Sequence, residues 1–218
     1  MNKSTPLLGL YGGTFDPVHH AHIIPVQQAA QQVGIEKIRL LPCHVPPHKN
    51  TPKTAPHHRL EMVKLVANAH PIFEVDDREL RRHKASYTVD TLEEINQEFD
   101  EASTPQTLAF FVGSDSIASF DKWHRWRDIF EYCHLVVCSR PGYQDKIKTL
   151  HPEISARVTA KVSDLYQQAN GKVFFAETDE IPISSTLIRE KLAQDAPVDA
   201  YLPDYILSYI RQHHLYLT

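Results

Sequence analysis

Glycine is scarce in this chain, with 7 residues among 218, whereas about 7% is usual in globular proteins. Gly9, Gly12 and Gly13 nevertheless lie almost together near the N-terminus, so the backbone there has a specific need for glycine. Cysteine is also scarce, at 3 residues, an odd number without the spacing of a zinc site. This excludes a disulfide-stapled framework and favours reduced thiols.

The chain also lacks a basic excess and a long apolar run. With 27 acidic and 23 basic side chains its net charge is −4, which argues against nucleic-acid and anionic-membrane partners. No apolar run approaches the roughly 18 residues of a membrane span, and the N-terminal segment does not resemble a signal peptide. We expect a cytoplasmic protein of one domain, 1–218, with a small helical part from about residue 184.

Short apolar runs alternate with longer amphipathic segments along the chain. This alternation predicts an α/β fold, a Rossmann-like parallel sheet with helices on both faces. Ligands of such sheets bind beyond the carboxyl ends of the strands, so the loops that follow the strands are the candidate site. The expected strands are 7–11, 37–41, 73–75, 108–112, 135–138 and 173–176, and the expected helices are 21–33, 57–69, 89–99, 125–132, 154–168, 185–193 and 204–213.

The first of these loops, GGTFDPVHHAH at 12–22, combines paired glycines with spaced histidines. Gly12 and Gly13 let backbone N–H groups approach a phosphate closely. His19 and His22, three residues apart at a helix start, point the same way and would donate to polyphosphate oxygens. A tight turn with incidental histidines is the alternative. The loop is neither a GxGxxG nor a GxxxxGK[ST] motif, and its spacing differs from the HExxH zinc motif.

This loop resembles the HxGH signature of the nucleotidyltransferase superfamily, with Ala21 in the position of the glycine. The loop PCHVPPHK at 42–49 is stiffened by proline, and Lys49 could reach a fixed anion or simply be solvated. It resembles the polyphosphate-contacting loop of bacterial nicotinate mononucleotide adenylyltransferases, which implies that His48 and Lys49 bind substrate. Arg59, just beyond, could point either way.

Two further segments match the same family. In ASYTVDTL at 85–92, Thr88 is the expected N-cap of a helix, beside Tyr87. The segment resembles the family's acid-binding turn, which implies that the backbone of Thr88 binds the nicotinate carboxylate. In GSDS at 113–116, Asp115 is placed to accept hydrogen bonds from ribose hydroxyls, although helix capping is the alternative.

A tryptophan and an arginine complete the expected mononucleotide site. Trp123 offers a flat face to an aromatic ring, although a core tryptophan is the alternative. The family resemblance implies that a tryptophan stacks on the nicotinate ring, and by spacing we favour Trp123 over Trp126. Arg140 in SRPGY suits a phosphate, although it could be an ordinary surface arginine.

The last motif is ISSTLIR at 183–189, where hydroxyls open a helix and Arg189 follows on the same face. Together they suit an anion, and ordinary capping is the alternative. The motif resembles the family's pattern and lacks the lysine run of class I aminoacyl-tRNA synthetases, which counts against an RNA-ligating role. The expected ATP-binding residues are Gly12, Gly13, Thr14, Phe15, His19, His22, Ser184, Ser185, Thr186 and Arg189.

The resemblance covers about residues 7–215 and implies an enzyme of NAD biosynthesis. The implied reaction transfers AMP from ATP to nicotinate mononucleotide, giving deamido-NAD and pyrophosphate. Magnesium would enter with ATP, without a dedicated protein site. The implied catalytic residues are His19, His22, Lys49 and Arg189.

Three alternatives stay open. The same chemistry could act on nicotinamide mononucleotide or phosphopantetheine. The chain could instead be a nucleotide-binding module without turnover. It could also be a metal-binding protein that uses His44, His48, His57 and His58.

Overall fold

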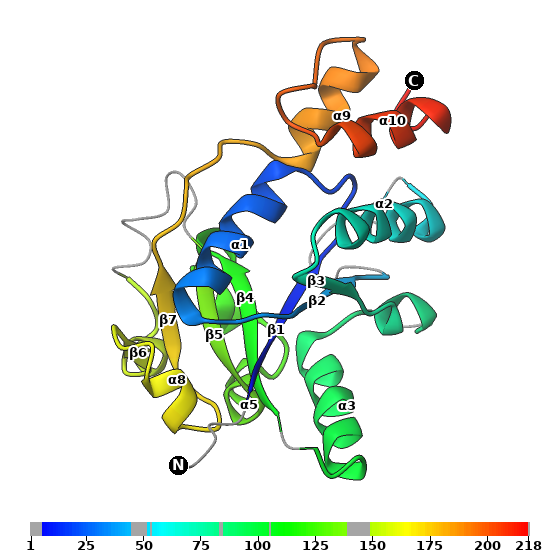
Figure 1. Ribbon diagram of the computed structural model, residues 1–218. Coiled ribbons are helices and arrows are strands. Elements are labelled where there is room, and N and C mark those ends of the chain that lie inside the picture. The colour runs from blue at the N-terminus through cyan, green and yellow to red at the C-terminus, as the bar shows by residue number, and fades with distance from the viewer. Residues whose placement is uncertain are drawn as a thin grey trace.

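The computed structural model describes residues 6–44, 52, 54–82, 85–104, 106–138 and 149–217. Its strands form one parallel sheet in the order β3-β2-β1-β4-β5-β7-β6 (Figure 1). The predicted fold class is therefore confirmed. The strands are β1 (Leu7–Gly13), β2 (Ile38–Pro42), β3 (Phe73–Val75), β4 (Thr107–Gly113), β5 (Cys133–Cys138), β6 (Val158–Thr159) and β7 (Val173–Ala176).

Helices cover both faces of the sheet because the central strands are apolar on both sides. In β1, Leu7 and Tyr11 join one core cluster, and Leu8 and Leu10 join the other. Such two-sided burial is typical of a parallel sheet. The first cluster is covered by α1 (His20–Val33), α2 (Pro56–Ala69) and α10 (Asp204–Gln212), the second by α3 (Thr88–Glu101) and α5 (Trp126–Tyr132).

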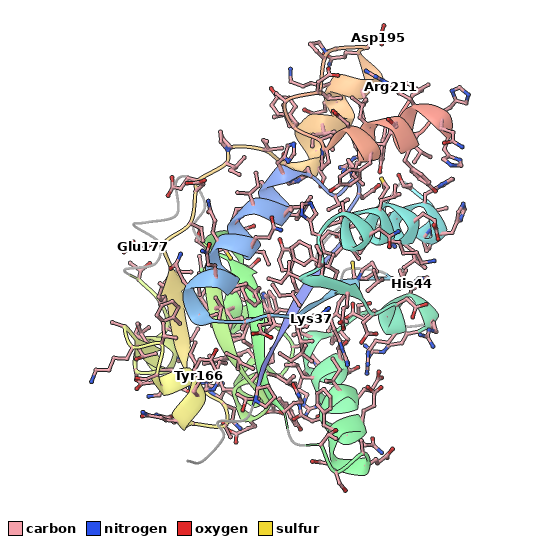
Figure 2. The ribbon with its side chains drawn as sticks, in the orientation of Figure 1. Lys37, His44, Tyr166, Glu177, Asp195 and Arg211 are labelled. Carbon is pink, nitrogen blue, oxygen red and sulfur yellow. The ribbon has the colours of Figure 1, made fainter. Side chains whose placement is uncertain are left out.

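The order of the strands reverses between β1 and β4. The chain runs outward from β1 to β3 and then returns, so that β4 pairs with the other side of β1, with Tyr11 opposite Phe111. A crevice forms at the carboxyl ends of two strands related in this way. Lys37 and His44, labelled in Figure 2, flank β2 and mark the amino and carboxyl edges of the sheet.

The predicted helix over 154–168 is wrong. The chain instead forms α7 (Pro152–Ser155), the short strand β6 and α8 (Asp164–Gln167). Ile154 is buried in the cluster under α3 and α5, whereas Leu165 is buried in the cluster under α1. One straight helix cannot bury both residues, so the chain passes the edge of the sheet, where Val158 pairs with Val173.

The C-terminal helices lie together at one end of the molecule, beside the start of α1 and α2 (Figure 1). Two tyrosine hydroxyls of α10 contact α2 and the residue that follows it, since Tyr209 Oη lies 2.9 Å from His58 Nδ1 and Tyr205 Oη lies 3.1 Å from Nε2 of His70, the C-cap of α2. Within the described ranges, no helix has the length and apolar character to cross a membrane. The remaining elements are η1 (Arg78–Arg81), α4 (Ser114–Ile117), η2 (Phe120–Lys122) and α9 (Ser185–Ala193).

Candidate functional site

A cavity of about 1060 Å³ opens where β1 and β4 end. It lies at the reversal of the strand order, where ligands of such sheets bind. Every candidate residue within the described ranges lines it, whereas His48, Lys49 and Arg140 lie outside those ranges. The candidates that line it are Gly12, Gly13, Thr14, Phe15, His19, His22, Tyr87, Thr88, Asp115, Trp123, Ser184, Ser185, Thr186 and Arg189.

The turn from β1 into α1 is tight, and this explains the glycine that ends β1. A Cβ atom on Gly13 would lie 2.8 Å from the ring of Phe15. That ring is 1% exposed, and Phe15 has a φ of 50°, in the left-handed region. The turn therefore folds back over its own strand and leaves backbone beside the cavity. Ala21, the departure from the HxGH signature, is buried and is not among the residues that line the cavity.

His19 and His22 form a pair at the start of α1. Their ring centroids are 3.8 Å apart, and Nδ1 of His22 accepts a hydrogen bond of 3.3 Å from the backbone N–H of His19. Because Nδ1 is an acceptor, the proton of a neutral His22 ring sits on Nε2. The pair lies over a helix N-terminus, which favours anions. The arrangement can donate hydrogen bonds to phosphate oxygens.

The start of α9 contacts the turn before α1. The Ser184 hydroxyl caps α9 by accepting from the Leu187 N–H at 3.2 Å, so the capping interpretation holds for this residue. Ser185 Oγ donates to the carbonyl of Pro17 at 3.0 Å. Arg189 donates to the carbonyl of Asp16 at 2.6 Å and to Thr186 Oγ1 at 3.2 Å. These bonds fix the guanidinium at the wall of the cavity.

The opposite wall comes from the segments before α3 and after β4. Thr88 is the first residue of α3 rather than its N-cap, which is Tyr87, and the Tyr87 side chain makes no capping hydrogen bond. The prediction of a Thr88 cap was therefore wrong by one position. The first N–H groups of α3 are not bonded within the helix, as at any helix start. The ring of Tyr87 lies against that of His124, with centroids 4.4 Å apart.

The two tryptophans occupy different environments. Trp123 is half-buried, lines the cavity and packs edge-on against Phe110 with centroids 6.4 Å apart. Trp126 is 7% exposed, packs against Phe120 and Phe130 in the core, and is not among the residues that line the cavity. Only the indole of Trp123 is therefore placed to stack on a ligand in this cavity.

Arg59, whose direction was open, points inward and is fully buried. Its Nη1 donates to the carbonyls of Thr14 at 2.8 Å and Cys43 at 2.7 Å, and Nη2 donates to that of His44 at 3.3 Å. It ties the loop after β1 to the loop after β2. Arg59 therefore holds the rim of the cavity in place and does not line it.

Sequence reasoning missed several side chains that line the cavity, including Asp16, Glu79, Lys122 and His124. Lys122 and His124 flank Trp123, and this adjacency was the available signal. Glu79 belongs to η1, and the sequence around it contains no motif that would have pointed to a ligand site. Its carboxylate accepts from Thr91 Oγ1 at 2.7 Å, and burial raises its pKa above the usual range of a glutamate.

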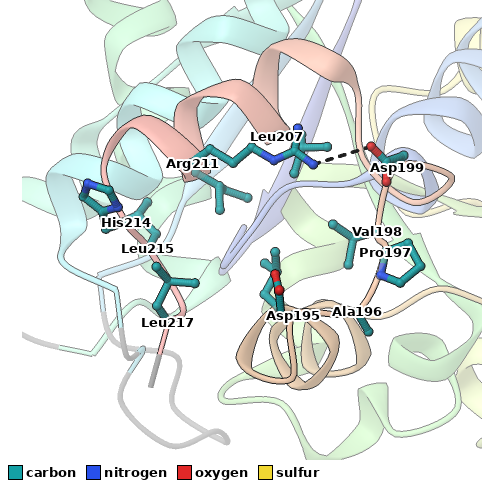
Figure 3. A pocket seen from close by; sticks show the side chains of 12 residues that line it. Asp195, Ala196, Pro197, Val198, Asp199, Leu207, Arg211, His214, Leu215 and Leu217 are labelled. Atoms are coloured by element: carbon teal, nitrogen blue, oxygen red, sulfur yellow. Dashed lines mark ion pairs between the residues drawn. The ribbon is translucent and has the colours of Figure 1, made fainter.

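A second cavity of about 420 Å³ lies between α9 and α10 (Figure 3). Its lining includes Leu192, Leu207 and Ile210, and an ion pair of 3.7 Å joins Arg211 to Asp199 at its side. It contains none of the predicted phosphate-binding residues. The chemistry that the motifs indicate is therefore concentrated in the larger cavity.

The histidine-based metal hypothesis finds no matching geometry in the part of the chain that the structure describes. No three His, Cys, Asp or Glu side chains there are grouped to hold a metal ion. The ring centroids of His57 and His58 are 4.1 Å apart, and those of His58 and His213, in the C-terminal segment, are 5.1 Å apart. These rings belong to the contact between α2 and the C-terminus.

Comparison with known proteins gives consistent results. The sequence profile of the cytidylyltransferase-like family matches residues 10–191. A relative from Pseudoalteromonas atlantica, named "Probable nicotinate-nucleotide adenylyltransferase", is 40% identical over 99% of this chain and 97% of its own length. A relative of the same name from Yersinia pestis is 42% identical over 96% of this chain and 95% of its own length.

Solved structures share the fold. Plasmodium falciparum nicotinic acid mononucleotide adenylyltransferase complexed with APC superposes with a TM-score of 0.69 over 97% of both chains, at 20% identity. The same protein complexed with NaAD superposes with a TM-score of 0.68, at the same identity and coverage. At this level of identity the likeness concerns the fold alone.

Proposed function

Because this chain belongs to the cytidylyltransferase-like family and to its nicotinate-nucleotide adenylyltransferases, we propose that it transfers AMP from ATP to nicotinate mononucleotide. The products are deamido-NAD and pyrophosphate. One observation carries the proposal beyond the family. A single cavity at the switch between β1 and β4 is lined by both the phosphate-binding and the mononucleotide-binding candidates. A transferase that joins two nucleotides needs both half-sites in contact.

ATP binds on the α1 and α9 side of the cavity in this proposal. The backbone at Gly12 and Gly13 and the start of α1 receive the triphosphate, and His22 donates from Nε2. Arg189 reaches the polyphosphate from α9, on the same side of the cavity, supported by its bonds of 2.6 Å to the carbonyl of Asp16 and 3.2 Å to Thr186 Oγ1. Cations and N–H groups thus surround the α-phosphate and the departing pyrophosphate.

Nicotinate mononucleotide binds on the α3 and α4 side. The N–H groups at the start of α3, at Thr88, suit the carboxylate, because a helix N-terminus favours an anion. Trp123 stacks on the pyridinium ring, which gains from the negative face of the indole. Asp115 accepts hydrogen bonds from ribose hydroxyls. His48, Lys49 and Arg140 remain proposed ligands from the sequence resemblance.

The chemistry needs alignment and charge neutralisation rather than a base. The nucleophile is a phosphate oxygen of the mononucleotide, which is already anionic. It forms a bond to the α-phosphorus of ATP while the bond from that phosphorus to the bridging oxygen of pyrophosphate breaks. No proton has to be removed, so His19, His22 and Arg189 contribute by holding the reacting groups and stabilising charge.

We propose magnesium as the cofactor, carried in with ATP. Phosphate oxygens and water are the ligands that this ion prefers in nucleotide sites. When bound, it would add positive charge beside the polyphosphate.

Pyrophosphate release tests the proposal. The chain is supplied with ATP and magnesium and, in parallel, with nicotinate mononucleotide, nicotinamide mononucleotide or phosphopantetheine. We expect a strong preference for nicotinate mononucleotide. Preference for another acceptor would overturn the assignment of a pyridine-carboxylate site. Absence of release with all three acceptors would overturn the assignment of the chain as an adenylyltransferase.

A matched pair of arginine variants sharpens this test. Arg189→Met removes the guanidinium at the cavity wall, whereas Arg211→Met removes one from α10 that lies outside this cavity. Loss of a transition-state donor commonly costs about 10²–10³ in kcat. We expect that loss for Arg189→Met and a rate within about twofold of the wild type for Arg211→Met. Equal rates in both variants would overturn the role of Arg189.

A further inference from the structure

The C-terminal end of the chain contacts the turn that precedes α1. Tyr216 Oη donates a hydrogen bond of 2.8 Å to Oδ1 of Asp16, and this aspartate is 3% exposed and lines the larger cavity. Burial and the neighbouring Asp16 carboxylate raise the pKa of the Tyr216 hydroxyl, which therefore stays a donor through the neutral range. The φ of Tyr216 is 64°, in the left-handed region that tyrosine rarely adopts. Tertiary contacts therefore hold the chain in this conformation.

The same turn also carries the two hydrogen bonds from α9. The carbonyl of Asp16 accepts from Arg189 at 2.6 Å, and the carbonyl of Pro17 accepts from Ser185 at 3.0 Å. Asp16 therefore contacts Tyr216 through its carboxylate and Arg189 through its backbone carbonyl. Its position sets the position of both the guanidinium and the histidines that follow.

We propose that Tyr216 is a positioning residue for adenylyl transfer, acting through Asp16 on Arg189 and the start of α1. This inference rests on the proposed function. A buried carboxylate is costly without donors, and the Tyr216 hydroxyl supplies one. Without that bond, the Asp16 side chain turns toward water and its backbone carbonyl shifts, which misaligns Arg189. Small misplacements of groups that act on the transition state reduce the rate of transfer more than the binding of substrate.

Two other tyrosines of the C-terminal segment are matched controls. The hydroxyl of Tyr205 lies 3.1 Å from Nε2 of His70, just after α2, and that of Tyr209 lies 2.9 Å from Nδ1 of His58 in α2. Neither tyrosine lines the cavity. Tyr216→Phe, Tyr205→Phe and Tyr209→Phe therefore remove the same atom from the same segment. Each variant loses the hydrogen bonding of one tyrosine hydroxyl, but only the first loses a contact to the turn before α1.

The test compares kcat, KM and thermal stability of the three variants in pyrophosphate release. We expect kcat of Tyr216→Phe to fall about tenfold or more, with KM for ATP within about threefold of the wild type. The other two variants should keep kcat within about twofold while their melting temperatures fall similarly. Wild-type kcat in Tyr216→Phe, or equal losses of kcat in all three variants, would overturn the proposal.

Amide hydrogen exchange gives a readout that does not need turnover. In Tyr216→Phe the amides of residues 14–16, 18 and 19 should exchange faster than in Tyr205→Phe, because the turn has lost its contact with Tyr216. Equal exchange would overturn the positioning role. A wild-type chain without pyrophosphate release would overturn the proposed function, and the exchange rates would still decide whether Tyr216 holds this turn.

Discussion

Arg59 Nη1 donates a hydrogen bond of 2.7 Å to the carbonyl of Cys43 from a fully buried position. The same guanidinium bonds the carbonyl of Thr14 at 2.8 Å. A helix residue thereby connects the ends of two neighbouring strands at the rim of the cavity. This guanidinium therefore holds the loops at the rim of the cavity together and does not line the cavity itself.

Replacing Arg59 tests that role. Arg59→Met leaves buried carbonyls without donors, each of which costs about 1–3 kcal/mol. We expect a loss of about 3 kcal/mol in unfolding free energy, or about 6–12 °C in melting temperature, by calorimetry. Arg127→Met, which removes an exposed arginine paired with Glu153, should lose less than about 1 kcal/mol. Similar losses in both variants would contradict the structural role.

His22 is expected to act on turnover rather than on binding. Its Nδ1 accepts from the His19 N–H, so Nε2 is the donor toward phosphate. We expect His22→Ala to lower kcat by about 10²–10³ with a smaller change in KM, measured by pyrophosphate release. His20→Ala changes the neighbouring side chain, which does not line the cavity, and should stay near wild type. Near wild-type turnover in His22→Ala would refute its assignment.

Tryptophan fluorescence separates the two indoles. The chain has 2 tryptophans, so each single variant leaves one reporter. Titration of nicotinate mononucleotide into Trp126→Phe should quench the emission of Trp123, and Trp123→Phe should show no quenching. Because stacking contributes about 0.5–1.5 kcal/mol beyond burial, KM for the mononucleotide should rise about 2- to 12-fold in Trp123→Leu, which keeps an apolar side chain but has no aromatic face. Quenching carried by Trp126 would contradict this assignment.

Glu79 gives a dependence of stability on pH with a defined sign. Burial raises the pKa of its carboxyl, so the folded state holds the proton more tightly than the unfolded chain. Stability due to this group therefore falls as pH rises from its ordinary pKa through the raised folded value. In urea unfolding, the free energy of unfolding of Glu79→Gln should therefore increase relative to that of the wild type as the pH rises from 4 to 7.

Glu153→Gln is the control of opposite sign. Arg127 lowers the pKa of the exposed Glu153 carboxyl, so its contribution to stability is present above the ordinary pKa. The free energy of unfolding of Glu153→Gln should therefore decrease relative to that of the wild type as the pH rises over the same range. The same trend in both glutamate variants would contradict the burial effect at Glu79.

Ala21→Gly tests the departure from the HxGH signature. The alanine side chain is buried and is not among the residues that line the cavity. We expect KM for ATP of the variant to stay within about twofold of the wild-type value. The free energy of unfolding should fall by about 0.5–1 kcal/mol, because glycine weakens α1. A marked decrease in KM would show that the methyl group restricts the nucleotide.

The alternation of apolar and amphipathic segments was sufficient to predict the parallel sheet and helices on both faces. The loop motifs predicted a set of described residues that meet at its carboxyl edge, among them Gly12 and Arg189, but not Asp16, Glu79, Lys122 or His124. Both are local patterns, and the geometry of parallel sheets brings the strand ends together wherever the chain runs between them.

Packing between distant segments decided the rest. Residues 154–168 break because Ile154 and Leu165 belong to cores on opposite faces. Arg59 turns inward because three backbone carbonyls converge on it. Tyr216 meets Asp16 across 200 residues of sequence. No local pattern reports such contacts, because a side chain's partner is determined by which elements the folded chain brings beside it.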